Sequence, residues 1–181
     1  MSKINIVNIE NIKIRKISID DVLALQKISL QTFKEAFSAR NKEENLRIYL
    51  DAAFTIDKLL AEIVNPFSEF YFAEIEKNTI GYLKLNVGDS QTELKEKNAL
   101  EIERIYVLKE FYGIGVGQIL YEKAIEIARL NDAEYVWLGV WEENPRAISF
   151  YKKNGFVEFD KHIFNMGNEH QTDIMMKLQL E

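Results

Sequence analysis

With 181 residues, the chain has room for one domain of ordinary size, and 47% hydrophobic beside 29% charged residues is typical of a protein with a buried core. The absence of cysteine excludes disulfides, thiolate metal sites and any covalent acyl-cysteine intermediate. A formal net charge of −6 argues against a nucleic-acid partner, which needs a basic face, and fits a small cationic substrate or plain solubility.

The first half of the chain is predicted to form a strand, three helices and a hairpin. Its N-terminal stretch lacks the apolar segment of a signal peptide, and no apolar run approaches the ~20 residues of a membrane span. We therefore expect a cytoplasmic protein with no membrane contact. Hydrophobic periodicity predicts a strand at 12–17, a helix that carries Val22 to Phe33, helices at 42–53 and 55–64, and strands at 70–75 and 79–88.

The second half is predicted to alternate strands with helices. A polar loop at 89–98 leads to a strand at 99–108, an amphipathic helix at about 115–131 and a buried strand at 135–140. A short helix at 145–154 has Asn144 at its N-cap and Gly155 as its stop, and closing strands are expected at about 156–165 and 172–180. This order predicts a mixed α/β (α+β) fold with a partly antiparallel sheet, not a doubly wound one.

A glycine-rich loop stands between the strand at 99–108 and the helix that follows. It reads Tyr112-Gly113-Ile114-Gly115-Val116-Gly117. Alternate glycines let the backbone approach a ligand closely, and the positive end of the helix dipole suits a pyrophosphate. A plain tight turn is the structural alternative. The spacing is neither that of the Rossmann G-x-G-x-x-G loop nor that of a P-loop.

A second segment of interest runs from Asn144 to Phe156 and reads NPRAISFYKKNGF. Helix capping alone would explain Asn144, and packing in the core would explain Phe150 and Tyr151. The two histidines, His162 and His170, match no familiar ligand spacing, and no G-x-S-x-G motif accompanies them. We therefore expect neither a metal site nor a Ser-His-Asp hydrolase.

Taken together, the segments from Leu100 to Phe156 resemble the acetyl-coenzyme A (acetyl-CoA) core of the GNAT superfamily of N-acetyltransferases. The order is strand, glycine loop, helix, strand, and an N-x-x-A-x-x-F-Y-x-x-x-G-F helix. LEIERIYV, WLGVWEEN, AISFYKKNGF and FNMGNEHQTDIMMK are similar to the PaiA-type bacterial spermidine/spermine acetyltransferases. The resemblance implies one GNAT domain over residues 1–181, with its acetyl-CoA core at about 99–156 and a largely antiparallel sheet of about six to seven strands flanked by helices.

The resemblance also implies which residues bind the cofactor. The pantetheine arm should pair with the backbone at Ile105, Tyr106 and Val107, the pyrophosphate should lie in the loop from Tyr112 to Gly117, and Asn144 should contact the cofactor. One position departs from the family's pattern, since Tyr112 stands where the family has Gln or Arg. A tyrosine offers a phosphate one hydroxyl in place of an amide or guanidinium, while the backbone cradle is unaffected.

Acetyl transfer to an amine needs a neutral amine, a stabilised oxyanion and a proton for the departing thiolate. Without cysteine, direct attack in a ternary complex is the natural route. The resemblance makes Tyr151 the acid, and a phenol with a pKa near ~10 is protonated at neutral pH. A backbone N–H near Ile105 to Val107 is the candidate oxyanion donor.

The base is open between two glutamates. Strand alternation predicts that Glu101 and Glu103 share a face with Ile105 and Val107, so either could take the ammonium proton directly or through water. Some GNAT enzymes carry a glutamate on this strand in that role. The alternative is a purely structural ion pair with a neighbour such as Arg104.

The acceptor is predicted to be a small polyamine such as spermidine or spermine. Acidic residues of the first helices could hold a polycation, or could form a solvated face: Glu35, Glu43, Glu44 and Asp51. Trp141 and Tyr82 could line the methylene chain, although buried aromatics need no ligand.

Other acceptors stay open within the class, namely a protein lysine, a protein N-terminus or another amine. A regulatory module that senses acetyl-CoA without catalysis is the alternative outside it, and Tyr112 is the one feature that points that way. With no basic recognition helix in the sequence, we expect no direct binding of nucleic acid. GNAT enzymes are often dimers, so the resemblance allows a homodimer.

Overall fold

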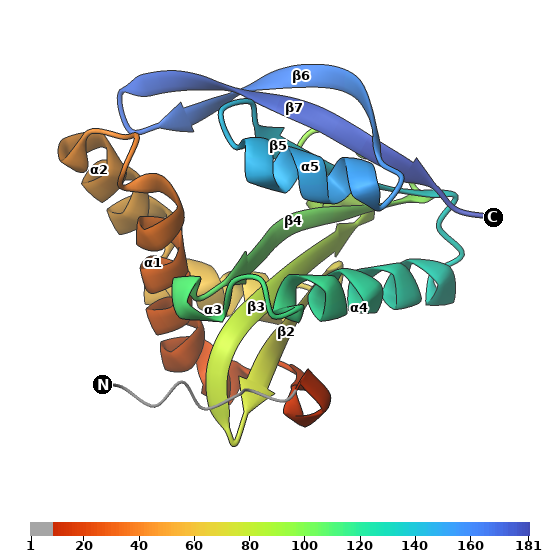
Figure 1. Cartoon of the computed structure of the whole chain (residues 1–181), viewed down its shortest axis with the longest axis horizontal. Helices are drawn as coiled ribbons and strands as arrows, with labels where there is room; N and C mark the ends of the chain where they lie inside the picture. The colour runs from red at the N-terminus through yellow and green to blue at the C-terminus, as the bar shows by residue number, and fades with distance from the viewer. Residues whose placement is uncertain (1–8) are drawn as a thin grey trace.

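Seven strands and five α-helices make up residues 9–181, the part of the chain described by the computed structural model (Figure 1). The strands are β1 (Lys13–Lys16), β2 (Ser68–Ile75), β3 (Asn78–Val87), β4 (Ala99–Val107), β5 (Tyr135–Trp141), β6 (Val157–Met166) and β7 (Glu169–Gln179). The helices are α1 (Val22–Phe37), α2 (Glu43–Ala53), α3 (Ile56–Val64), α4 (Val116–Leu130) and α5 (Pro145–Lys153). Residues 1–8, part of the stretch in which we expect no signal peptide, lie outside the described residues.

One sheet holds all seven strands in the order β1-β2-β3-β4-β5-β7-β6. Only β4 and β5 pair in parallel, and every other neighbouring pair is antiparallel. The predicted mixed α/β fold with a largely antiparallel sheet is therefore confirmed. No helix between residues 9 and 181 is long and apolar enough to cross a membrane.

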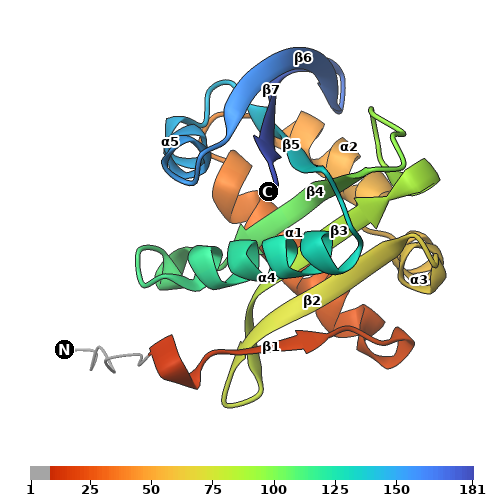
Figure 2. The ribbon, with the colours of Figure 1, turned by 90° about the vertical axis from the view of Figure 1, so that its right-hand side faces the viewer.

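Helices cover both faces of the sheet, so the molecule has two hydrophobic cores (Figures 1 and 2). The core beneath α4 and α5 includes Leu83, Leu100, Ile102, Leu120, Ala124, Tyr151 and Phe156. The core beneath α1, α2 and α3 includes Leu25, Phe33, Leu46, Phe54, Leu59, Phe70, Phe72 and Tyr82. Burial of apolar side chains on both faces stabilises the sheet through the hydrophobic effect.

β4 and β5 separate after only three residue pairs. Their parallel pairing runs from Ala99 opposite Tyr135 to Glu101 opposite Trp137. Beyond Glu101, no other strand of residues 9–181 joins this edge of β4. Because the N–H and C=O groups of alternate residues point toward this edge, the end of β4 presents backbone hydrogen-bonding groups to the gap.

A β-bulge in β4 interrupts the alternation of its side chains. Ile102 lies opposite Leu85 on β3, and Arg104 lies opposite Lys84, so Glu103 is an extra residue on β4. Such an insertion reverses the faces of the residues that follow it, because side chains in a strand alternate with a period of two.

The bulge overturns one expectation about the two glutamates. Ile105 and Val107 pack against the α4 core. Glu101 and Glu103 share a hydrogen-bond donor, Asn86, and lie on the face covered by α3. The prediction that both glutamates share a face with Ile105 and Val107 is wrong, because sequence alternation does not account for the extra residue.

Candidate active site

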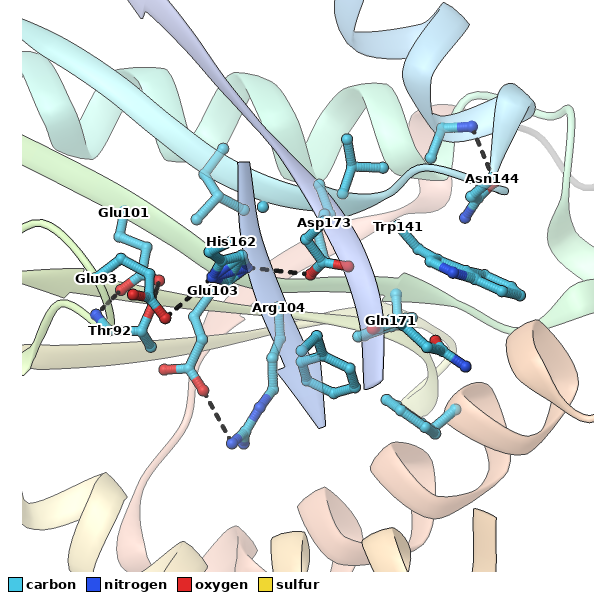
Figure 3. Close-up of a pocket in the computed structure, with 18 of the residues that line it drawn as sticks. Thr92, Glu93, Glu101, Glu103, Arg104, Trp141, Asn144, His162, Gln171 and Asp173 are labelled. Atoms are coloured by element: carbon cyan, nitrogen blue, oxygen red, sulfur yellow. Dashed lines mark hydrogen bonds and ion pairs between the residues drawn. The ribbon is translucent and has the colours of Figure 1, made fainter. Parts of the chain in front are cut away.

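The gap between β4 and β5 opens into a cavity of about 420 Å³ (Figure 3). Its lining comes from α1, α2, β4, β5, α5, β6, β7 and the loop before β4. Aromatic side chains form much of the wall: Phe33, Phe37, Tyr49, Phe54, Tyr106, Trp141 and Phe164. The polar and charged lining includes Glu93, Glu101, Glu103, Arg104, Asn144, Tyr151, His162 and Asp173.

The glycine loop enters α4 in a conformation that suits an anion. Gly113 and Gly115 have φ angles of 81° and 95°, in the left-handed region that favours glycine. Gly115 is the N-cap of α4, whose first-turn N–H groups have no partner within the helix. A Cβ added to Gly117 would meet no heavy atom within 4 Å, so the space in front of this turn is open. Free N–H groups at the positive end of a helix dipole form an anion-binding site.

Tyr112, at the start of the loop, stacks on a cation. The guanidinium carbon of Arg146 lies 3.6 Å from the centroid of the Tyr112 ring. Arg146 belongs to the first turn of α5, so the contact joins the glycine loop to the second segment of the predicted acetyl-CoA core. Position 112 thus lacks the guanidinium or amide that the resemblance leads us to expect, and a guanidinium from α5 lies against its ring.

Asn144 and Tyr151 both line the cavity. Asn144 caps α5, since its Oδ1 accepts the N–H of Ala147 at 3.1 Å, and it lies at the opposite end of the cavity from Glu101 (Figure 3). Tyr151 is 7% exposed and packs against Phe150 and Phe156. Burial raises the pKa of the Tyr151 phenol, so it stays protonated well above neutral pH.

Glu101 is a buried carboxylate held by neutral donors. It accepts hydrogen bonds from Asn86 Nδ2 and Thr92 N, each at 2.9 Å, and from the Thr92 hydroxyl. The residue is only 2% exposed to solvent. Burial raises the pKa of Glu101, and the hydrogen bonds from Asn86 and Thr92 oppose that rise without cancelling it.

Glu103 belongs to a buried ion network with two cations. Its carboxylate lies 2.6 Å from Lys84 Nζ and 2.9 Å from Arg104 Nη2. Both cations also pair with Glu62 of α3, at 3.2 Å and 2.9 Å. Burial would raise the pKa of Glu103, but Arg104 and Lys84 outweigh it and lower that pKa. The ion-pair alternative weighed from the sequence is therefore present for Glu103.

The structure also brings His162 and Asp173 into the cavity, where the sequence showed no pattern. They stand opposite each other in the β6–β7 ladder, with 3.4 Å between Nε2 and Oδ2. Burial raises the pKa of Asp173 to about 6, although His162 opposes the rise. Within residues 9–181, no cluster of three or more potential ligands is placed to bind a metal.

The acidic residues expected on the acceptor side lie elsewhere. None of Glu35, Glu43, Glu44 and Asp51 lines the cavity. Glu35 accepts the backbone N–H of Lys109 at 2.7 Å, and Asp51 has a side chain that is 70% exposed. Trp141 does line the cavity, whereas Tyr82 is fully buried in the core beneath α1 to α3. The carboxylates that do line the cavity come from β4, β7 and the loop before β4.

Known sequences settle the family of the chain. The model of the acetyltransferase (GNAT) family matches residues 25–156. The chain belongs to the GNAT family of acetyltransferases. An uncharacterised N-acetyltransferase of Lactobacillus delbrueckii subsp. lactis is 40% identical over 169 residues, which cover 93% of this chain and 98% of that protein. The spermidine N(1)-acetyltransferase of Thermoplasma acidophilum is 28% identical over 150 residues, covering 81% and 88%.

Solved structures of GNAT proteins have the same fold. The PaiA N-acetyltransferase of Thermoplasma acidophilum, in complex with coenzyme A, superposes with a TM-score of 0.79 at 26% identity, covering 93% of this chain and 99% of that one. YncA of Salmonella typhimurium, with acetyl-CoA, has a TM-score of 0.72 at 20% identity, covering 94% and 95%, a likeness of fold alone. This GNAT protein is thus an acetyl-CoA-dependent N-acetyltransferase, as the sequence predicted.

Proposed function

We propose that this GNAT enzyme transfers the acetyl group of acetyl-CoA to a primary amine of a small polyamine such as spermidine or spermine. The observation that carries the proposal is the charge of the cavity. Within residues 9–181, three of its carboxylates, those of Glu93, Glu101 and Asp173, have Asn86, Thr92 and His162 as their hydrogen-bond or ion-pair partners, and no lysine or arginine. Arg104 also lines the cavity, but Glu62 and Glu103 neutralise it. Uncompensated negative charge in a concave site attracts a cation.

The walls of the cavity also suit a polyamine. Between its ammonium groups a polyamine carries apolar methylenes, and aromatic faces attract both methylenes and cations. Phe33, Phe37 and Trp141 line the cavity, and Phe37 lies 5.7 Å from Trp141 between ring centroids. The similarity to a spermidine acetyltransferase of Thermoplasma acidophilum, at 28% identity, supports the same class of acceptor.

The cofactor would lie along the predicted core. The free backbone edge of β4 at Ile105, Tyr106 and Val107 would pair with the pantetheine arm, as a strand would. The first turn of α4 and the loop from Tyr112 to Gly117 would hold the pyrophosphate, and Asn144 would contact the cofactor from β5's side of the gap. When bound, acetyl-CoA supplies an activated thioester carbonyl to the cavity.

Attack by the neutral amine forms the C–N bond of the amide and breaks the C–S bond of the thioester. Tyr151 would give its phenolic proton to the departing sulfur, since burial keeps that phenol protonated. A backbone N–H at Ile105 to Val107 would stabilise the oxyanion. Glu101 would keep negative charge at the end of the cavity away from Asn144 and serve as a base or an entry to the proton path. Glu103 is the weaker choice, because two cations hold its carboxylate.

The test is thiol release from acetyl-CoA with spermidine, spermine, putrescine, lysine peptides and no amine. We expect the highest kcat/KM with spermidine or spermine, because a substrate with more ammonium groups is attracted more strongly by the negative charge of the cavity. A matched control is Glu43→Gln, which removes an exposed carboxylate outside the cavity and should leave kcat/KM unchanged. Preference for a lysine peptide would reassign the acceptor to a protein. Tight acetyl-CoA binding without turnover on any amine would contradict catalysis and favour a regulatory module.

A further inference from the structure

His162 lies between two carboxylates that come from different parts of the chain. Its Nε2 is 3.4 Å from Asp173 Oδ2 on β7, and its Nδ1 is 3.0 Å from Glu93 Oε1 in the loop before β4. The Nδ1 contact is close but not aligned as a hydrogen bond. All three residues line the cavity (Figure 3). An imidazole with one carboxylate at each ring nitrogen can receive a proton on one side and release one on the other.

The three side chains differ in their access to solvent. The exposed fractions are 16% for Asp173, 18% for His162 and 43% for Glu93. Asp173 also stands opposite Trp141 in the β5–β7 ladder, in the part of the wall that continues toward Asn144. The row therefore begins inside the cavity at Asp173 and ends at the surface with Glu93.

Two features of the fold keep this row in place. Position 139 of β5 is a glycine, and a Cβ there would lie 3.1 Å from His162 Nε2 and 3.4 Å from Asp173 Oδ2. Gln91 ties the loop to β5, since its Oε1 accepts the Trp137 indole N–H at 2.6 Å. The loop thereby holds Glu93 beside the ring, while the glycine leaves room for the inner contact.

The other carboxylates of the cavity are less free to exchange a proton. Glu101 accepts three hydrogen bonds, and Glu103 is paired with Lys84 and Arg104. Among residues 9–181, Asp173 has a single side-chain partner, the His162 ring, at a distance that a proton transfer would shorten. In the part of the chain that the structure describes, Asp173 thus has weaker competing contacts than Glu101 or Glu103.

We propose that Asp173, His162 and Glu93 form the proton relay that deprotonates the acceptor ammonium and carries its proton to solvent, and that Glu101 acts through its charge and not as the base. This proposal rests on the proposed amine acetyltransfer. Asp173 accepts a proton from R–NH₃⁺, Nε2 of His162 takes it from Asp173, and Nδ1 passes a proton to Glu93 and on to water. The neutral amine then attacks the thioester, the C–N bond forms and the C–S bond breaks.

The proton balance closes with Tyr151. Its phenol protonates the thiolate, and the second proton lost by the nitrogen restores the phenol, so one proton leaves per turnover. The charged groups around the relay are Glu101 on β4, Glu142 after β5 and Lys161 on β6, of which the last two pair at 3.4 Å. Burial raises the pKa of Asp173 to about 6, which brings proton exchange at that carboxyl close to neutral pH.

The deciding experiment is the pH dependence of kcat/KM for spermidine in His162→Gln, with His170→Gln as the control. His170 lies at the β6–β7 turn, is exposed, and contacts Asn165 rather than the cavity. We expect His162→Gln to lose about ten- to a hundred-fold at pH 7, within the range of general acid–base catalysis. The loss should shrink to less than about threefold near pH 9.5, where more of the ammonium, with a pKa near ~10, deprotonates without help.

A second variant guards against a folding defect. Glu93→Gln changes a loop residue that is 43% exposed, so the fold should tolerate it, and it should show a smaller loss with the same pH dependence. A loss that is equal at both pH values, or no loss, in His162→Gln would overturn the relay while the acetyltransferase function stands. Wild-type enzyme that turns over no amine at any pH would overturn the relay together with the proposed function.

Discussion

The two sides of the cavity differ in whether backbone or side-chain groups form them. The proposed cofactor side comes from one continuous stretch, residues 99–156, and would bind mainly through backbone: the free edge of β4, the glycine loop and the first turn of α4. The proposed acceptor side is made of side chains from α1, α2, β4, β6, β7 and the loop before β4. Its carboxylates and His162 are far apart in the sequence and meet only because β5 pairs with β7, and β7 with β6.

This difference has a physical consequence for substitutions. A backbone site is insensitive to the identity of most side chains but sensitive to any Cβ that fills its space. A site made of buried side chains depends on the balance of charge, since an unpaired buried ion is strongly destabilising. Substitutions on each side should therefore fail in different ways.

The largest effect is expected at Tyr151, where the two sides meet. Tyr151→Phe should lower kcat about 10²- to 10⁴-fold, because it removes the proton for the thiolate, while coenzyme A affinity stays the same. Thiol release and calorimetric titration measure the two quantities. Tyr121→Phe is the control, because Tyr121 packs in the same aromatic cluster but does not line the cavity. Retained kcat in Tyr151→Phe would remove this residue from its proposed role.

On the acceptor side, we expect a substitution that breaks the buried ion network to lower the stability of the fold. Arg104→Met leaves Glu62 and Glu103 with Lys84 as their shared cation, so the free energy of unfolding should fall by about 3–5 kcal/mol. Denaturant titration measures this loss. In the exposed pair of Arg15 with Asp21, Arg15→Met should cost no more than about 1 kcal/mol. Equal losses at both arginines would mean that burial of the network contributes nothing.

The cofactor side should fail through added volume. A Cβ at Gly117 touches no protein atom, so Gly117→Ala should leave stability unchanged or raise it by about 0.5–1 kcal/mol. Coenzyme A affinity should fall by about 1–3 kcal/mol, since the methyl group occupies the open space before α4. Gly115→Ala is the contrasting variant, because a side chain at a φ of 95° is strained and should destabilise the fold itself. Unchanged affinity in Gly117→Ala would move the pyrophosphate away from this turn.

The smallest effect is expected from the side chains of the cofactor side. Arg146→Gln removes the guanidinium stacked on Tyr112 and should weaken coenzyme A binding about two- to fivefold, or about 0.5–1 kcal/mol. Titrations at low and high salt should show the defect shrinking as salt rises, because the lost interaction is electrostatic. Tyr112→Phe keeps the ring and should bind almost as the wild type does. A larger defect in Tyr112→Phe than in Arg146→Gln would assign the contact to the hydroxyl.

The element boundaries show how far local pattern reaches. The strand expected at 99–108 forms at Ala99–Val107, and the helix expected at 115–131 forms at Val116–Leu130. Asn144 does cap α5 and also lines the cavity, so the two readings of that residue are compatible. Glu101 lines the cavity, but its side chain lies on the face of the sheet opposite to that of Ile105 and Val107. The bulge at Glu103 is one extra residue in a strand, and no turn residue marks it in the sequence.

By itself, the sequence determined the family and the order of the elements, and it predicted the backbone part of the site, since each depends on spacings within a few residues. The tertiary structure alone decided which side chains share the cavity. Asp173 faces His162 because of the register of β6 on β7. Glu93 lies beside His162 because the hydrogen bond between Gln91 and Trp137 holds its loop against β5. Register and anchoring follow from the packing of whole strands, so residues that carry no local signal become neighbours only in the folded chain.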